Sequence, residues 1–296
     1  MKKCLIILTA YLLCCGAVAH AEEAKVFASN YPLSYFAQRI SGNSEIVIFP
    51  EIDGDPAFWE PKPADIIIMQ QSDIILLNGA GYEKWQTAVS LPKRKIVYTS
   101  KAFQPRYIFM EEAVDHAHGP SGAHSHSGTA FTTWLDLSQA AFQVKAIRDA
   151  MEKRGISSSD ELQRNFESLI EDLRALDTEI NEMVLGHSKA PLVASHPVYQ
   201  YFARRYRLNI KAVLWEPNVF PDEQMWAHLE EIVKEHPAKW MIWEGEPLPQ
   251  SIARLKGMGI KSIVFDPCGN QPERGDFLSV MKQNVENLRE IFRNEP

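Results

Sequence analysis

Short apolar runs alternate with segments of helical periodicity along the first part of the chain. Ile74 to Leu77 is a continuous apolar run, which is typical of a strand buried on both faces. Around it, the pattern predicts strands at 25–28, 45–49, 74–77 and 95–99, and helices at 33–40, 64–71 and 137–153. Strands that alternate with helices predict parallel β-α-β units, because two parallel strands need a crossover connection between them.

One long amphipathic segment separates this part from a second series of strands and helices. From 162 to 185 apolar side chains recur at helical spacing, and a helix of roughly 25 residues is about 38 Å long. Beyond it, the pattern predicts strands at 192–194, 211–215, 239–244 and 262–266, and helices at 197–206, 221–235, 248–257 and 276–293. The sequence therefore predicts an α/β protein with two α/β lobes, each a mostly parallel sheet flanked by helices, joined by one long rigid helix.

The first 21 residues are typical of a secretory signal peptide. Lys2 and Lys3 precede an apolar run, and small residues follow near a cleavage site. The apolar run is shorter than the roughly 20 residues that span a bilayer. We therefore divide the chain into a signal peptide at 1–21, an N-terminal lobe at 22–156, a linking helix at 157–187 and a C-terminal lobe at 188–296. The N-terminal lobe includes a histidine-rich loop at 115–128.

The cysteines bear on the location of the protein and on its attachment to a membrane. Cys14 and Cys15 allow attachment of a lipid as an alternative, but the residues before them are large, which favours plain cleavage of the signal. We expect a periplasmic protein, with lipoprotein anchoring as the less favoured alternative. Cleavage would leave Cys268 as the one cysteine, so no intrachain disulfide is expected.

Composition excludes several classes of protein. With 45% hydrophobic and 23% charged residues, the chain is typical of a globular protein and not of a disordered one. The net charge is −7 and no basic face stands out, so nucleic acid is not expected as a partner. We expect a monomer.

The segment 115–128 is of low complexity and rich in histidine. Of the nine histidines in the chain, four lie here: His116, His118, His124 and His126. We interpret them as imidazoles on a flexible tether that capture a borderline metal such as zinc. The alternative is a solvated linker in which the histidines have no function.

Polar residues follow each predicted strand of the C-terminal lobe, and they are His196, Glu216, Glu244 and Asp266. In a parallel sheet all four strand ends lie on the same edge, where open α/β sheets bind ligands. We interpret Glu216 and Glu244 as helix-capping residues at strand-to-helix turns. His196 and Asp266 are the pair that we expect to bind a divalent cation.

The chain resembles the zinc/manganese solute-binding proteins of ABC importers over nearly its whole mature length. The motifs that carry the resemblance are Asn30-Tyr31-Pro32, the segment 56–65, the segment 78–85, Trp134-Leu135-Asp136, Ser195-His196-Pro197 and Asp266-Pro267. The resemblance implies two α/β lobes with a rigid connecting helix and a cleft that holds the cargo. It also implies a zinc or manganese ion as cargo and an inner-membrane permease as partner.

The chain departs from this family at two positions. The family usually binds its metal with three histidines and one carboxylate, of which His196 and Asp266 match the third histidine and the carboxylate. Ala57 and Thr132 stand where the other two histidines are expected. One interpretation is that Glu60 or the loop histidines complete the coordination shell.

Two other interpretations stay open. The cleft could take a different ligand, such as a metal complex or a small organic molecule, against aromatic walls formed by Trp59, Trp134, Trp215 and Trp243. Those tryptophans could equally be core residues. Alternatively, the protein could buffer metal or act as a partner protein. No Gly-x-Ser-x-Gly elbow, P-loop or His-Glu-x-x-His motif is present, so we do not expect an enzyme.

Overall fold

The structure is a computed structural model, and it describes residues 24–110, 115–118, 122–125, 128–187 and 189–293. The predicted signal peptide and His126 lie outside these residues. No helix in the described ranges is long and apolar enough to cross a membrane.

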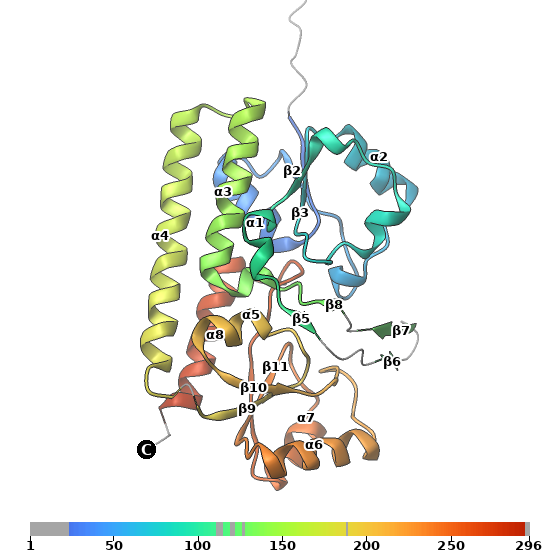
Figure 1. Cartoon of the computed structure of the whole chain (residues 1–296), viewed down its shortest axis with the longest axis vertical. Coiled ribbons are helices and arrows are strands. Elements are labelled where there is room, and N and C mark those ends of the chain that lie inside the picture. The colour runs from blue at the N-terminus through green and yellow to red at the C-terminus, as the bar shows by residue number, and fades with distance from the viewer. Residues whose placement is uncertain (1–23, 111–114, 119–121, 126–127, 188, 294–296) are drawn as a thin grey trace, which may run out of the picture.

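Two parallel four-stranded sheets form the framework, one in each half of the chain (Figure 1). The first sheet has the order β2-β1-β3-β4, with strands β1 (Val26–Ala28), β2 (Val47–Ile48), β3 (Ile74–Leu77) and β4 (Ile96–Tyr98). The second has the order β10-β9-β11-β12, with strands β9 (Pro191–Ala194), β10 (Asn209–Ala212), β11 (Trp240–Trp243) and β12 (Lys261–Val264). In both sheets the first strand lies between the second and the third, so the two halves repeat one topology.

Helices cover both sheets, and their positions follow the periodicity of the sequence. They are α1 (Tyr31–Ser41), α2 (Pro63–Gln71), α3 (Leu137–Arg154), α4 (Ser159–Val184), α5 (Gln200–Tyr206), α6 (Glu223–Glu235), α7 (Pro249–Gly257) and α8 (Phe277–Phe292). The two lobes and the connecting helix predicted from the sequence are confirmed. The exact boundaries of the signal peptide, the two lobes and the linking helix stay a prediction.

Helix α4 ties the two halves together. It is 26 residues long, runs past both sheets (Figure 1), and contacts α1 and α3 of the first half and α5 and α8 of the second. The main apolar core is continuous along it, since Leu169 and Leu173 belong to the same buried cluster as Val26 and Ile242. Burial of this apolar stripe against helices of both halves, at roughly 25 cal/mol per Å² of apolar surface, stabilises the connection between them.

Some boundaries differ from the expectation for local reasons. Strand β10 ends at Ala212, three residues before the expected end. The helix expected from residue 197 begins at Gln200, because Val198 N–H is bonded to His196 O, 2.9 Å away, in a turn. Around Trp85 the chain forms a short 3-10 helix, η2 (Lys84–Ala88).

The described parts of the histidine-rich segment form a β-hairpin, which the sequence pattern did not predict. Strand β6 (Asp115–His118) pairs antiparallel with β7 (Gly122–Ser125), and His116 lies opposite His124 in the register. The hairpin follows β5 (Phe109–Met110) and precedes β8 (Gly128–Thr129), which also pair with each other. Alternating small residues and histidines are compatible with a two-stranded ribbon, which periodicity alone did not indicate.

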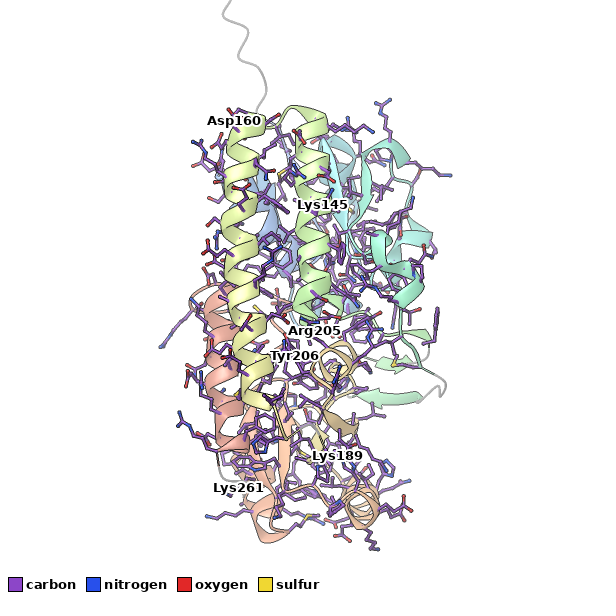
Figure 2. The ribbon with its side chains drawn as sticks, turned by 60° about the vertical axis from the view of Figure 1, so that its left-hand side comes forward. Lys145, Asp160, Lys189, Arg205, Tyr206 and Lys261 are labelled. Atoms are coloured by element: carbon purple, nitrogen blue, oxygen red, sulfur yellow. The ribbon has the colours of Figure 1, made fainter. Side chains whose placement is uncertain are left out.

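One ion pair anchors the second sheet's first helix to α4. Arg205 on α5 donates from two guanidinium nitrogens to the Asp177 carboxylate, with 2.9 Å between Nε and Oδ1, and Tyr206 Oη donates to the same Oδ1 at 2.9 Å. Figure 2 shows Arg205 and Tyr206 beside α4. The Asp177 side chain is only 18% exposed, so its loss would leave a buried hydroxyl and a guanidinium without their acceptor.

We predict that Asp177→Ala lowers the free energy of unfolding by about 1–3 kcal/mol, measured by urea denaturation. The matched control is Asp149→Ala on α3, whose carboxylate is 45% exposed and pairs with the exposed Lys145 at 2.6 Å. Asp149 also lies 2.9 Å from Arg148, which keeps Gln163 as an acceptor in the variant. That control should lose no more than about 0.5 kcal/mol. Equal losses in the two variants would contradict the anchoring role of Asp177.

Candidate metal centre

Three possible metal donors meet at one edge of the second sheet. His196 follows β9, Glu216 follows β10 and Glu244 follows β11, and β9 lies between the other two strands. His196 Nδ1 lies 3.9 Å from Glu216 Oε1 and 3.6 Å from Glu244 Oε1. One ligand atom from each residue lies within 4.8 Å of the other two, which is a spacing that a single cation can bridge.

The backbone fixes this arrangement. Ser195 N–H donates to Ile242 O at 2.8 Å, which continues the β9–β11 pairing one residue beyond the strand. Trp215 N–H donates to Ser195 O at 2.7 Å, which places the next residue, Glu216, beside His196. The three side chains therefore converge because of the parallel register of three neighbouring strands.

The electrostatics of the group favour a bound cation. The His196 side chain is 7% exposed, and those of Glu244 and Glu216 are 22% and 32% exposed. Burial raises the pKa of Glu244 well above its usual value, and the carboxylates of Glu216, Asp55 and Asp266 raise it further. A cation would offset this repulsion and stabilise both ionised glutamates.

The interpretation of Glu216 and Glu244 as helix caps is wrong. The N-cap of α6 is Asp222, whose carboxylate accepts the Met225 N–H, and α7 begins after Leu248. The strand-end positions of both glutamates were visible in the sequence. What the sequence did not show is that α6 and α7 each begin several residues later, and that both glutamate side chains lie close to His196.

Asp266 lies outside this group of donors, as does Glu60, among the residues that the structure describes. Asp266 Oδ1 accepts the Cys268 N–H at 2.7 Å and so supports the turn at 266–268, while burial raises its pKa. Its charge still reaches the site, since it contributes to the raised pKa of Glu244. Glu60 is exposed.

The two positions that lack the expected histidines have other roles. Ala57 is 1% exposed within the main core. Thr132 is buried, and its hydroxyl donates to Val198 O, in the loop that carries His196. In the first half of the chain, these two positions therefore supply a core contact and a hydrogen bond between the halves in place of metal donors.

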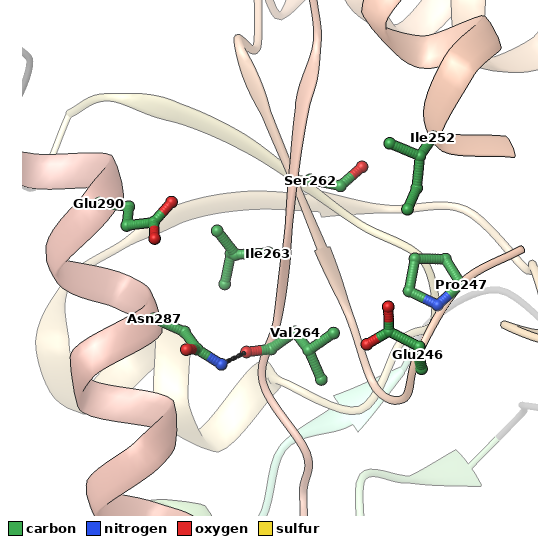
Figure 3. Close-up of a pocket in the computed structure, with 8 residues that line it drawn as sticks. All are labelled: Glu246, Pro247, Ile252, Ser262, Ile263, Val264, Asn287 and Glu290. Atoms are coloured by element: carbon green, nitrogen blue, oxygen red, sulfur yellow. Dashed lines mark hydrogen bonds between the residues drawn. The ribbon is translucent and has the colours of Figure 1, made fainter. Parts of the chain in front are cut away.

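The expected aromatic walls are mostly core. Trp215 and Trp243 are fully buried in a separate cluster with Trp226, and Trp134 is buried and donates its indole N–H to Pro267 O at 2.8 Å. Trp59 is half-buried against Phe27 and Trp85. A cavity of about 280 Å³ does lie beside β12, lined in part by Glu246, Pro247 and Glu290 (Figure 3), but none of the three donors lines it.

The remaining candidates are the loop histidines. The structure describes the backbone of His116, His118 and His124 in the β6–β7 hairpin, and it does not test them as ligands.

Two α/β lobes with a group of candidate metal donors at the carboxyl edge of one sheet are the arrangement expected of a solute-binding protein that carries a metal. Residues 26–291 match the sequence model of the family described as zinc-uptake complex component A, periplasmic. The chain belongs to this family of substrate-binding components of metal importers.

Curated relatives agree with this class over nearly their full length. The metal ABC transporter substrate-binding lipoprotein ScbA of Streptococcus cristatus is 24% identical, and the alignment covers 98% of this chain and 99% of the relative. The manganese-binding lipoprotein MntA of Halalkalibacterium halodurans is 23% identical, with 92% and 89% covered. Neither description names a catalytic activity. Both relatives are lipoproteins, which counts against the expectation that lipid anchoring is the less favoured alternative.

Solved structures share the fold. Zn(II)-bound AdcA from Streptococcus pneumoniae superimposes with a TM-score of 0.77 at 20% identity, over 93% of this chain and 59% of that one. The metal-dependent lipoprotein YcdH from Bacillus subtilis gives 0.74 at 21% identity, over 90% and 98%.

The raised pKa of Glu244 predicts how the stability of the metal-free protein depends on pH. Because the pKa is higher in the folded than in the unfolded state, folding takes up a proton between the two values, and stability falls as pH rises through that window. Glu244→Gln removes this penalty, so we predict that it raises the free energy of unfolding by about 1–2 kcal/mol at pH 7.5.

The gain should shrink toward zero near pH 4, where Glu244 is protonated in both states. Urea unfolding in the presence of a chelator measures both values. Glu246→Gln, on the exposed neighbouring residue, is the control and should change stability little at either pH. A Glu244→Gln variant that is destabilised at pH 7.5 would contradict the electrostatic account.

Proposed function

We propose that this protein captures a divalent metal ion outside the cytoplasm, zinc in the first place, and delivers it to the permease of an ABC importer. The observation that carries the proposal is the convergence of His196, Glu216 and Glu244 donor atoms within 4.8 Å of one another. The carboxylate of Asp266 adds negative charge nearby. We infer that the ion binds as cargo and that the donor residues do no chemistry on it.

The donor set fits a transported ion. One imidazole and two carboxylates suit zinc, iron and manganese, and three protein donors leave at least one coordination position to water. An incomplete shell makes release less costly than from a closed structural site, where binding is worth about 10–16 kcal/mol. The relative MntA, which is named for manganese, falls within the same range of cations.

We also propose that the export signal places the protein on the outer side of the inner membrane, in the periplasm if the cell has one. Cys14 and Cys15 are the candidates for a lipid anchor, in line with the lipoprotein relatives. The monomeric state expected from the sequence stays a prediction.

The central test is the affinity of purified, tag-free protein for Zn²⁺ and Mn²⁺ by calorimetry. We predict that His196→Ala weakens binding at least about 100-fold, since it removes the imidazole between the two carboxylates. His228→Ala is the matched control, because His228 is exposed on α6 and should leave the affinity unchanged. Absence of binding heat and of bound metal in the wild type would refute the metal function and favour a different ligand for the cleft.

The histidine-rich hairpin has a separate role in this proposal. We infer that His116, His118, His124 and His126 capture the ion transiently and raise its local concentration near the site. Deleting 116–126 should therefore slow loading at low zinc concentration and leave the equilibrium Kd of the His196 site within about twofold. Stopped-flow loading followed with a zinc indicator measures the rate, and a Kd that weakens as strongly as in His196→Ala would contradict this division of roles.

A further inference from the structure

The segment that follows β12 lies beside the candidate metal centre. It leaves the second sheet at the same edge as the loops after β9, β10 and β11, which carry His196, Glu216 and Glu244. Strand β12 pairs with β11, so this segment begins next to the loop that holds Glu244. Its hydrogen bonds lead from there to the first half of the chain.

Two backbone carbonyls of the segment accept hydrogen bonds from the first half. Pro267 O accepts the Trp134 indole N–H at 2.8 Å, and Gly269 O accepts the Tyr31 N–H at 3.0 Å. Both donors are buried. These two bonds therefore form a closed part of the contact between the halves.

Asn270, the next residue, makes a contact of a different kind. Its side-chain nitrogen Nδ2 donates to Ile52 O at 2.8 Å and to Gly54 O at 3.1 Å, so one side chain holds two carbonyls of the loop that follows β2. Gly54 is exposed and Asn270 is half-buried. Because water can replace exposed hydrogen bonds at little cost, this contact can open without unfolding of the protein.

The second half holds its side of the contact in place. Phe265 O accepts the Tyr199 hydroxyl at 2.7 Å, and Tyr199 belongs to the same connection as His196. The Asn284 side chain accepts the Asp266 N–H at 2.9 Å and donates to Asp266 O at 2.7 Å. The segment is thus fixed to the second half up to Asp266, and the movable partner of Asn270 is the loop of the first half.

That loop ends close to the candidate metal centre. Asp55 follows Gly54, and its carboxylate is near enough to act electrostatically on Glu244. Asp55 Oδ1 also accepts the Ala57 N–H at 2.8 Å, which fixes the end of the loop to the first half. The loop 52–54 is therefore anchored on one side by its own half and on the other by Asn270.

We propose that Asn270 controls how fast the candidate metal centre exchanges its ion, because its amide holds the loop 52–54 across one side of the centre. The proposal rests on the proposed function, since it concerns the loading of the same site. The contact includes none of the candidate donors, so it is equally strong in the empty and the loaded protein. Breaking it lowers the barrier to entry and to release by the same amount and leaves their ratio, the Kd, unchanged.

Stopped-flow measurements on the purified mature chain test this. Dissociation of Zn²⁺ is followed into an excess of chelator, and association is followed with a zinc indicator. In Asn270→Ala both rate constants should rise about fivefold or more, as expected for the loss of two partly exposed hydrogen bonds, with Kd within about twofold of the wild type. Asn270→Leu, which keeps the volume and cannot donate, should behave in the same way.

Asn287→Ala is the matched control. Asn287 Nδ2 donates to Val264 O at 2.8 Å, which is the same kind of bond near the same strand end, but within the second half alone. Both rate constants should stay within about twofold of the wild type in this variant. Wild-type rates in both Asn270 variants, an equal acceleration in Asn287→Ala, or a faster dissociation without a faster association would overturn the proposal.

A measurement on the metal-free protein separates this proposal from the proposed function. The backbone order parameters of Asp53 and Gly54 from ¹⁵N relaxation should fall from about 0.85 to below about 0.6 in Asn270→Ala and stay unchanged in Asn287→Ala. Unchanged order parameters in Asn270→Ala would overturn the role of Asn270 even if the ion binds. Failure of the wild type to bind Zn²⁺ or Mn²⁺ would instead refute the proposed function, so the two failures are distinguishable.

Discussion

The repulsion between two carboxylates that face one imidazole is the constraint on which the candidate site depends. Glu216 and Glu244 approach His196 from the strands on either side of β9, and the parallel register places them beside it. Burial and neighbouring charges raise the pKa of Glu244, so the fold maintains an electrostatically unfavourable group in the absence of a cation. Such perturbed groups are characteristic of functional sites.

The rest of the molecule stabilises this arrangement by joining the two halves firmly. Helix α4 contacts helices of both halves, and direct hydrogen bonds cross between the halves: Thr132 to Val198, Trp134 to Pro267 and Asn270 to Ile52. Ala57 is a core residue and Thr132 makes a hydrogen bond between the halves, so the candidate metal donors among the described residues all follow strands of the second sheet.

Two loops at one edge of the second sheet hold the candidate donor carboxylates. The loops after β10 and β11 each carry a glutamate donor, and Pro217 and Gly245 pack them against each other. Hydrogen bonds anchor the loop 216–221 at both ends, which holds Glu216 in place beside His196.

The sequence by itself determined the two α/β lobes, the long connecting helix and the strand ends that hold His196, because apolar periodicity and strand–helix alternation are local properties. It also showed that Ala57 and Thr132 lack imidazoles. Only the tertiary structure decided that Glu216 and Glu244, and not Asp266 or Glu60, gather around His196. The order of strands in a sheet depends on contacts between residues far apart in the chain. Without that order, the four strand ends could not be told apart.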